Sequence, residues 1–221
     1  MRIAVALLFA LLSATAHPAP FAVQVGDARV ALDSPPGFSD TMFTGSPRLQ
    51  ELAESLTSAS NRILLFALTD ADLRRFTLGD PIEGRRYMVA VTPRVMERER
   101  ITAATFGAFV SEALQGLGQP PAPGTDFRGH LDKKKPGTPA LLAELRRDPD
   151  VVSVLQGARL PTVEGREEAP QYMLSTTTLI LLRGKALSLT VHSAWEGPAD
   201  VDWIRAITGR WIDDLQRLNS R

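Results

Sequence analysis

The amino-acid sequence predicts an α+β fold, in which antiparallel hairpins are separated by helices along the chain. The clearest observation is a strand, a tight turn, a second strand and an amphipathic helix in succession over residues 171–218. A second hairpin pattern occupies residues 21–32, and helical patterns lie between the two hairpins. Strands grouped into hairpins favour an antiparallel α+β sandwich over a parallel α/β fold.

The C-terminal hairpin has two strand patterns, Tyr172–Leu182 and Ala186–Trp195, joined by Arg183-Gly184-Lys185. We predict Gly184-Lys185 as the two-residue turn, because glycine at the first central position adopts the positive φ that such turns require. This register gives a mostly apolar, core-facing side with the pairs Leu182/Leu187, Ile180/Leu189 and Thr178/Val191. The other side is half polar and carries the pairs Leu181/Ser188, Leu179/Thr190 and Thr177/His192.

A long helix is predicted directly after this hairpin. It has Pro198 at its first position and Asp200 and Asp202 in its first turn, where the helix dipole favours acidic residues. Mostly apolar residues recur at helical spacing and form one stripe that packs on the sheet: Val201, Ile204, Thr208, Trp211, Leu215 and Leu218.

The rest of the chain adds strands and shorter helices. Apolar or alternating runs predict five more strands, at 21–25, 28–32, 61–69, 86–92 and 151–155. Helices are predicted after the capping residues Ser46 and Thr102, because their side chains can accept hydrogen bonds from the first turn. One turn of helix is expected at 70–73, and a short helix over 139–147 leads to the strand at 151–155.

The N-terminus resembles a secretory signal peptide over residues 1–16. One basic residue is followed by an apolar run at 3–12 and by the small residues Ser13, Ala14 and Ala16. Cleavage after Ala16 leaves a mature chain that begins at His17; the alternative is an uncleaved anchor. The run is shorter than the roughly 20 residues of a membrane-spanning helix, so we expect a periplasmic or secreted protein.

Composition limits the remaining possibilities. Residues 17–221 suit one domain, large enough to bury about 70% of its unfolded surface. The chain has no cysteine, which excludes disulfides, thiolate metal sites and cysteine nucleophiles. Lys and Arg total 25, as do Asp and Glu, so no broad attraction to nucleic acid or anionic lipid is expected.

Residues 119–139 form a long connection with five prolines, three glycines and the basic run Lys133-Lys134-Lys135. Loops of this length inside a compact domain are uncommon and are often functional or disordered. The functional interpretation is a docking or lid loop. The alternative is a solvated excursion, because a proline-rich and weakly apolar segment buries little surface.

Three features together resemble the PsbP/Mog-like superfamily, which includes PsbP, Ran-binding Mog proteins and bacterial DcrB-type periplasmic proteins. They are an opening strand that runs into Pro-Pro-Gly-Phe at 35–38, a sheet interrupted by helices, and the Leu-Arg-Gly-Lys-Ala-Leu-Ser-Leu hairpin at 182–189 followed by the tryptophan-containing final helix with its acidic start. The resemblance covers the order of elements over most of residues 17–221. It implies a central antiparallel sheet of about six strands with helices packed on both faces, and an accessory or binding role without a shared catalytic motif.

The half-polar side of the hairpin is the first candidate binding surface, with Thr177, Ser188, Thr190 and His192. A hydroxyl near a histidine suits nucleophilic catalysis, but no Gly-x-Ser-x-Gly turn is present and no acid is assigned to orient the imidazole. Hydroxyls and a histidine are also ordinary on the outer side of a hairpin. A second candidate surface is the 119–139 connection, with His130, Lys133, Lys134 and Lys135.

Spacings typical of metal or phosphate sites are missing from the sequence. There is no His-x-x-x-His, no His-Glu-x-x-His and no Asp-x-Asp-x-Asp-Gly run, and Gly116 and Gly118 end a helix rather than begin one. Three lysines in a row without aromatic neighbours do not make a nucleic-acid surface. We therefore assign no cofactor, no metal and no nucleic-acid partner.

The sequence predicts an exported, non-enzymatic accessory or binding domain of the bacterial cell envelope, with an envelope protein or a small ligand as its partner. The alternative is a metal-independent hydrolase that uses His192 with a nearby serine or threonine. A carboxylate within hydrogen-bond reach of His192, in a deep pocket, would favour the hydrolase.

Overall fold

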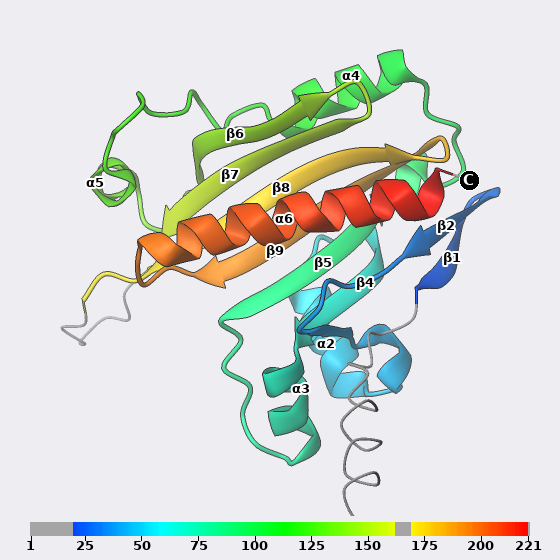
Figure 1. Ribbon diagram of the computed structural model, residues 1–221, viewed down its shortest axis with the longest axis horizontal. Helices are drawn as coiled ribbons and strands as arrows, with labels where there is room; N and C mark the ends of the chain where they lie inside the picture. The colour runs from blue at the N-terminus through cyan, green and yellow to red at the C-terminus, as the bar shows by residue number, and fades with distance from the viewer. Residues whose placement is uncertain (1–19, 162–168, 221) are drawn as a thin grey trace, which may run out of the picture.

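A computed structural model describes residues 20–161 and 169–220 of the chain (Figure 1). The predicted signal peptide at 1–16 and its new terminus at His17 lie outside the described residues, as do residues 162–168. Within the described ranges, no helix is long and apolar enough to cross a membrane.

Seven strands form one antiparallel sheet in the order β3-β4-β5-β9-β8-β7-β6. Their bounds are β3 Phe38–Asp40, β4 Asn61–Thr69, β5 Arg86–Pro93, β6 Ala140–Asp148, β7 Val151–Arg159, β8 Tyr172–Leu182 and β9 Lys185–Ala194. Every neighbouring pair is antiparallel. The predicted α+β class with a large antiparallel sheet is confirmed, and the sheet has seven strands rather than about six.

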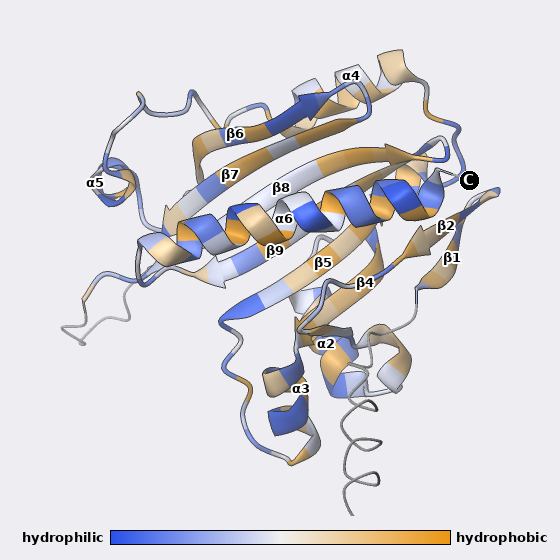
Figure 2. Cartoon of the chain, in the orientation of Figure 1, coloured by the Kyte–Doolittle hydropathy of each residue, from blue (hydrophilic) through white to orange (hydrophobic). Residues whose placement is uncertain are grey.

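Helix α6 (Pro198–Asn219) covers one face of the sheet, which we call the α6 face (Figure 1). Figure 2 shows apolar residues concentrated on the strands and on one stripe of α6, whose remaining surface is largely hydrophilic. The stripe places Ile204, Trp211 and Leu215 in the main core. Small buried hydroxyl residues on the sheet let α6 approach closely, and one of them, Thr176, hydrogen-bonds to Thr208 across 2.9 Å.

A small separate sheet packs beside α6. It consists of β1 (Phe21–Val25) and β2 (Ala28–Leu32), the hairpin predicted from the sequence. The Asn219 side chain holds β2 by accepting a hydrogen bond from the Ala31 N–H at 2.9 Å and donating to its carbonyl at 2.8 Å. The Trp211 indole N–H donates to the carbonyl of Asp33 at 2.8 Å. The C-terminal half of α6 therefore links the two sheets.

The opposite face of the sheet carries two further apolar clusters. Helices α2 (Pro47–Ser55) and α3 (Asp70–Thr77) cover one of them, around Phe66 and Leu68. Helix α4 (Ala103–Ala113) covers the other, around Val152, Leu179 and Ala186. Helices consequently pack on both faces of the sheet. Two 3₁₀ turns, η1 (Met42–Thr44) and η2 (Arg94–Met96), complete the described elements on this side.

The short helix predicted over 139–147 is wrong, because this segment is strand β6. Ala140 and Leu142 are buried, and the strand pairs with the apolar strand β7. Ala, Leu, Glu and Arg are good helix formers, but intrinsic propensity is a weak influence, and the pairing with β7 overrides it. Two register irregularities interrupt β6, a common feature of an edge strand.

The turn of the C-terminal hairpin lies one residue earlier than predicted. Arg183 and Gly184 form it, with φ of 52° and 78°, and two positive φ values match the twist of the flanking strands. Lys185, which was predicted to be a turn residue, is therefore the first residue of β9 and pairs with Leu182. The register moves by two residues, so the assignment of side chains to the two faces is unchanged.

Lys185 is consequently a buried strand residue, and its side chain is 1% exposed. Its ammonium donates hydrogen bonds to the carbonyls of Glu97 and Glu99 and lies 2.7 Å from the carboxylate of Asp27. The lysine lowers the pKa of Asp27, chiefly by hydrogen bonding. At the β1–β2 turn, a side chain on Gly26 would lie 2.3 Å from the Glu97 carbonyl. Lys185 thus ties β9 to the small sheet.

Candidate functional site

The predicted polar residues of the hairpin do lie together, on the face opposite α6. Thr177 pairs with Thr190, Ser188 with Leu179, and His192 with Ser175, so His192 faces Ser175 rather than the predicted Thr177. All of these polar side chains are half-buried. We call Ser175, Thr177, Ser188, Thr190 and His192 the polar strip.

His192 is packed in a way that does not suit a catalytic base. Its ring stacks on Tyr87 of β5, with centroids 4.3 Å apart and an angle of 14° between the planes. Burial lowers the pKa of His192 to about 4 and raises the pKa of Tyr87. Within the described ranges no carboxylate hydrogen-bonds to the imidazole. The nearby Thr177 hydroxyl accepts a hydrogen bond from the Gln156 amide at 2.9 Å.

The second candidate surface lies on the other face of the sheet. His130 belongs to α5 (Phe127–Asp132), a short helix capped by Asp126 inside the connection that was predicted to be a long loop. Leu131 of this helix is fully buried, and a side chain on Gly157 would approach it to 2.8 Å. Lys133, Lys134 and Lys135 follow α5 and are all exposed.

Gly157 pairs with Leu174, which lies in the core under α6. Because side chains alternate between faces along a strand, α5 is on the α6 face and the polar strip is on the other. The structure therefore does not bring the two candidate surfaces together on one face.

A cleft opens where the two faces meet, at the start of β5 and β8 and the end of β9. It consists of two recesses of about 260 and 660 Å³ that share Glu83, Arg85, Ala194 and Glu196 as lining residues. We call the pair the end cleft. The larger recess is lined by Met173 and Ala194, which point to the same face as the polar strip, and by Arg128 of α5. The end cleft thus joins the strands of the first surface to the segment that carries the second.

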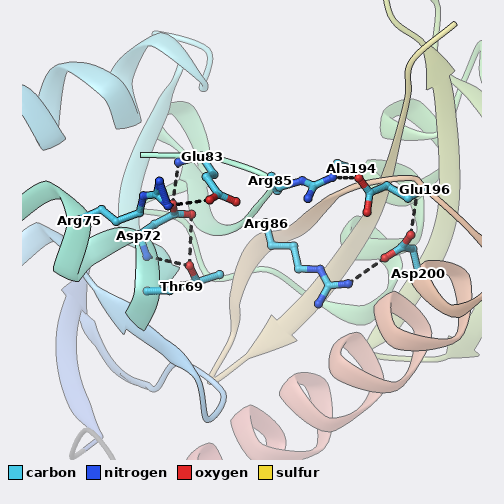
Figure 3. Close-up of a pocket in the computed structure, with 10 residues that line it drawn as sticks. Thr69, Asp72, Arg75, Glu83, Arg85, Arg86, Ala194, Glu196 and Asp200 are labelled. Carbon is cyan, nitrogen blue, oxygen red and sulfur yellow. Dashed lines mark hydrogen bonds and ion pairs between the residues drawn. The ribbon is translucent and has the colours of Figure 1, made fainter. Parts of the chain in front are cut away.

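The smaller recess is lined by arginines that are paired with acids (Figure 3). Arg75 pairs with Glu83 at 2.7 Å, Arg86 pairs with Asp200 at 2.8 Å, and Arg85 pairs with Glu196. Asp200 also accepts hydrogen bonds from the backbone N–H groups of Glu196 and Gly197, just before α6. Each arginine of this recess is therefore paired with an acid, and Asp72 adds a fourth carboxylate.

The larger recess has an aromatic wall. The rings of Tyr172 and Trp195 meet edge to face, with centroids 5.7 Å apart. The guanidinium of Arg128 lies 5.3 Å from the Tyr172 ring and 5.0 Å from the Trp195 ring, within range of cation–π attraction. The Tyr172 hydroxyl donates to Asp132 at 2.7 Å, and this hydrogen bond raises the pKa of the tyrosine.

Arg85, Arg86, Arg128 and Glu196 were not singled out in the sequence. Arg86 and Asp200 are 114 positions apart, and Arg128 meets Glu196 across 68 positions, so no local pattern reports either contact. The one available signal was Trp195, an aromatic residue at the end of a strand and next to an acid.

Among the described residues, no group of three or more histidines and acids is arranged to hold a metal ion. The described side chains of the end cleft instead offer aromatic surface, hydrogen-bond donors and, in Arg128, a cation with no acidic partner among the described residues. Compared with known proteins, the chain matches no protein-family model and no curated protein sequence.

Proposed function

We propose that this chain is a non-enzymatic binding domain of the bacterial cell envelope and that its ligand or partner segment occupies the end cleft. The observation that carries this proposal is the larger recess of about 660 Å³. Its volume lies in the range of small-molecule sites, which combine apolar walls with a few polar groups. The signal-peptide pattern and the PsbP/Mog-like resemblance support an exported, accessory role.

The environment of His192 favours binding over hydrolysis. A general base works best with a pKa near the operating pH, and burial holds the pKa of His192 at about 4. The imidazole is stacked on Tyr87 and has no orienting carboxylate among the described residues. The arrangement of nucleophile, base and acid that a hydrolase requires is therefore not assembled around this residue.

The test uses nuclear magnetic resonance spectra of the ¹⁵N-labelled full chain mixed with the small-molecule and peptide fraction of a bacterial envelope extract. We expect shifts of amide signals from residues 84–86, 172–173 and 194–196. Ala194→Trp should abolish them, because Ala194 lines both recesses. The matched control is Ala206→Trp on the exposed side of α6, which should retain the shifts.

Two results would contradict the proposal. One is the absence of shifts in the end cleft, or shifts that persist in Ala194→Trp. The other is hydrolysis of nitrophenyl esters that is lost in His192→Ala and retained in Ala194→Trp, which would support the hydrolase instead.

A further inference from the structure

We infer that the end cleft binds an organic monocarboxylate with an apolar body, and that Arg128 recognises its carboxylate. This inference rests on the proposed function and specifies its ligand. It starts from the charges of the arginines that line the cleft. Arg75, Arg85 and Arg86 are each paired with an acid. Within the described residues, Arg128 instead contacts backbone carbonyls and aromatic rings.

The hydrogen bonds that Arg128 makes leave some N–H donors of its guanidinium available to a ligand in the end cleft. Its Nη2 donates to the carbonyls of Trp195 at 3.2 Å and Glu196 at 2.7 Å. A guanidinium has five N–H donors, of which Nη2 carries two. Within the described part of the chain, Nε and Nη1 make no hydrogen bond. Three N–H groups with a full positive charge therefore remain for a ligand.

The guanidinium is also held in place before any ligand arrives. Its contacts with Tyr172 and Trp195 limit its rotation, and the two carbonyls fix its orientation. The helix that carries it is anchored by the buried side chain of Leu131. Pre-organisation of this kind reduces the entropy lost on binding, and planar arginine donors suit carboxylates.

The rest of the recess determines the remainder of the ligand. Leu160, Pro170 and Met173 line it together with the two aromatic rings, and these residues favour an apolar body. Glu83 and Glu196 line the wall shared by both recesses. Both carboxylates are already paired, with Arg75 and Arg85. Among the described lining residues this leaves Arg128 as the cation available to a ligand, so a monocarboxylate fits better than a dicarboxylate or a phosphate.

The experiment titrates the labelled full chain with benzoate, hexanoate and indole-3-acetate, with the corresponding amides, and with inorganic phosphate. The side-chain Nε–H signal of Arg128 and the indole N–H signal of Trp195 report binding. We expect the acids to bind about tenfold or more tightly than their amides, since a hydrogen bond to a charged group contributes about 1.5–3 kcal/mol. Phosphate should leave both signals unchanged.

Two arginine variants give the matched comparison. Arg128→Gln should weaken binding of the acids by about tenfold or more, whereas Arg210→Gln, the same change at an exposed position of α6, should not alter it. Near-ultraviolet circular dichroism confirms that each variant is folded. Arg128→Lys keeps the charge but loses the planar stacking, so an intermediate affinity is expected.

The inference is overturned if none of the acids binds, if acids and amides bind equally, if Arg128→Gln binds as tightly as the unaltered chain, or if phosphate shifts the Arg128 signal. These results remain distinguishable from failure of the proposed function. The distinguishing result is a shift of the end-cleft amide signals by extract components in the unaltered chain and in Arg128→Gln but not in Ala194→Trp. That result would support the proposed binding function and exclude only recognition of a carboxylate by Arg128.

Discussion

At the scale of single residues, burial rather than residue type decides what a side chain can do. His192 and His130 are both candidate functional histidines in the sequence. In the structure His192 is stacked on Tyr87, and burial lowers the pKa of His192. Lys185 belongs to a turn in the predicted register, but in the structure it is a buried cation with three oxygen partners. No local sequence pattern marks Arg128 as a candidate site residue.

The lowered pKa of His192 predicts a dependence of stability on pH. The folded protein keeps the imidazole neutral down to about pH 4, whereas the unfolded chain protonates it near the ordinary pKa of 6.5. Between pH 6.5 and about pH 4 the unfolded state therefore binds more protons than the folded state. The stability associated with the neutral His192 is fully present above pH 6.5 and is lost as the pH falls to about 4. From pH 7.5 to pH 4 this loss removes about 3 kcal/mol from the free energy of unfolding.

Urea denaturation at a series of pH values measures this effect. Acidic groups also change the stability over this range, so the informative quantity is the difference between the unaltered chain and His192→Asn. We expect the loss of stability below pH 6.5 to be smaller in the variant. Equal losses in both proteins would contradict the assignment of a neutral, buried imidazole.

At the scale of elements, a two-residue error in the predicted register of a strand leaves each side chain on its predicted face of the sheet. The hairpin turn is displaced from its predicted place, but Leu189 remains in the core and Thr190 remains on the opposite face. Strand β6 is the contrary case, because its residues favour a helix and only the partner strand β7 makes it extended. The intrinsic helix propensity of a segment has little influence where an adjacent long apolar strand can pair with that segment.

The two faces of β9 predict different costs for the same substitution. Leu189→Asp should lower the free energy of unfolding by more than about 4 kcal/mol, because it places an unpaired charge in the core. Thr190→Asp at the half-buried neighbouring position should cost about 1 kcal/mol. Thermal melting monitored by circular dichroism compares them, and similar melting temperatures would show that the faces are misassigned.

At the scale of the whole molecule, α6 organises the fold by contacting both sheets. Its stripe packs on the seven-stranded sheet, and its last turn holds the small sheet through Asn219. The same helix begins at the end cleft, where Asp200 binds Arg86. One element therefore connects the candidate site, the core and the N-terminal hairpin.

Asn219→Ala should loosen the small sheet, which Trp211 and Lys185 still hold, without unfolding the large one. The substitution removes the hydrogen bonds to both backbone groups of Ala31 and to the Leu215 carbonyl. A loss of about 2 kcal/mol is expected, equivalent to about thirtyfold faster hydrogen exchange of β1 and β2 amides. Amides in β8 and β9 should exchange at an unchanged rate, as should all amides in the control Ser220→Ala. Uniform acceleration across both sheets would show that they open as one unit.

The sequence alone determined the α+β class, most strands, the capped helices and the two sides of the C-terminal hairpin. These follow from periodicity, capping residues and turn residues, which act between neighbours along the chain. It also identified the polar strip apart from Ser175, because alternation assigns Thr177, Ser188, Thr190 and His192 to one side. Only the tertiary structure decided that residues 140–148 form an edge strand and that α5 lies on the α6 face. It alone assembled the end cleft, because Arg128 meets Glu196 and Arg86 meets Asp200 through contacts between distant segments that no local pattern encodes.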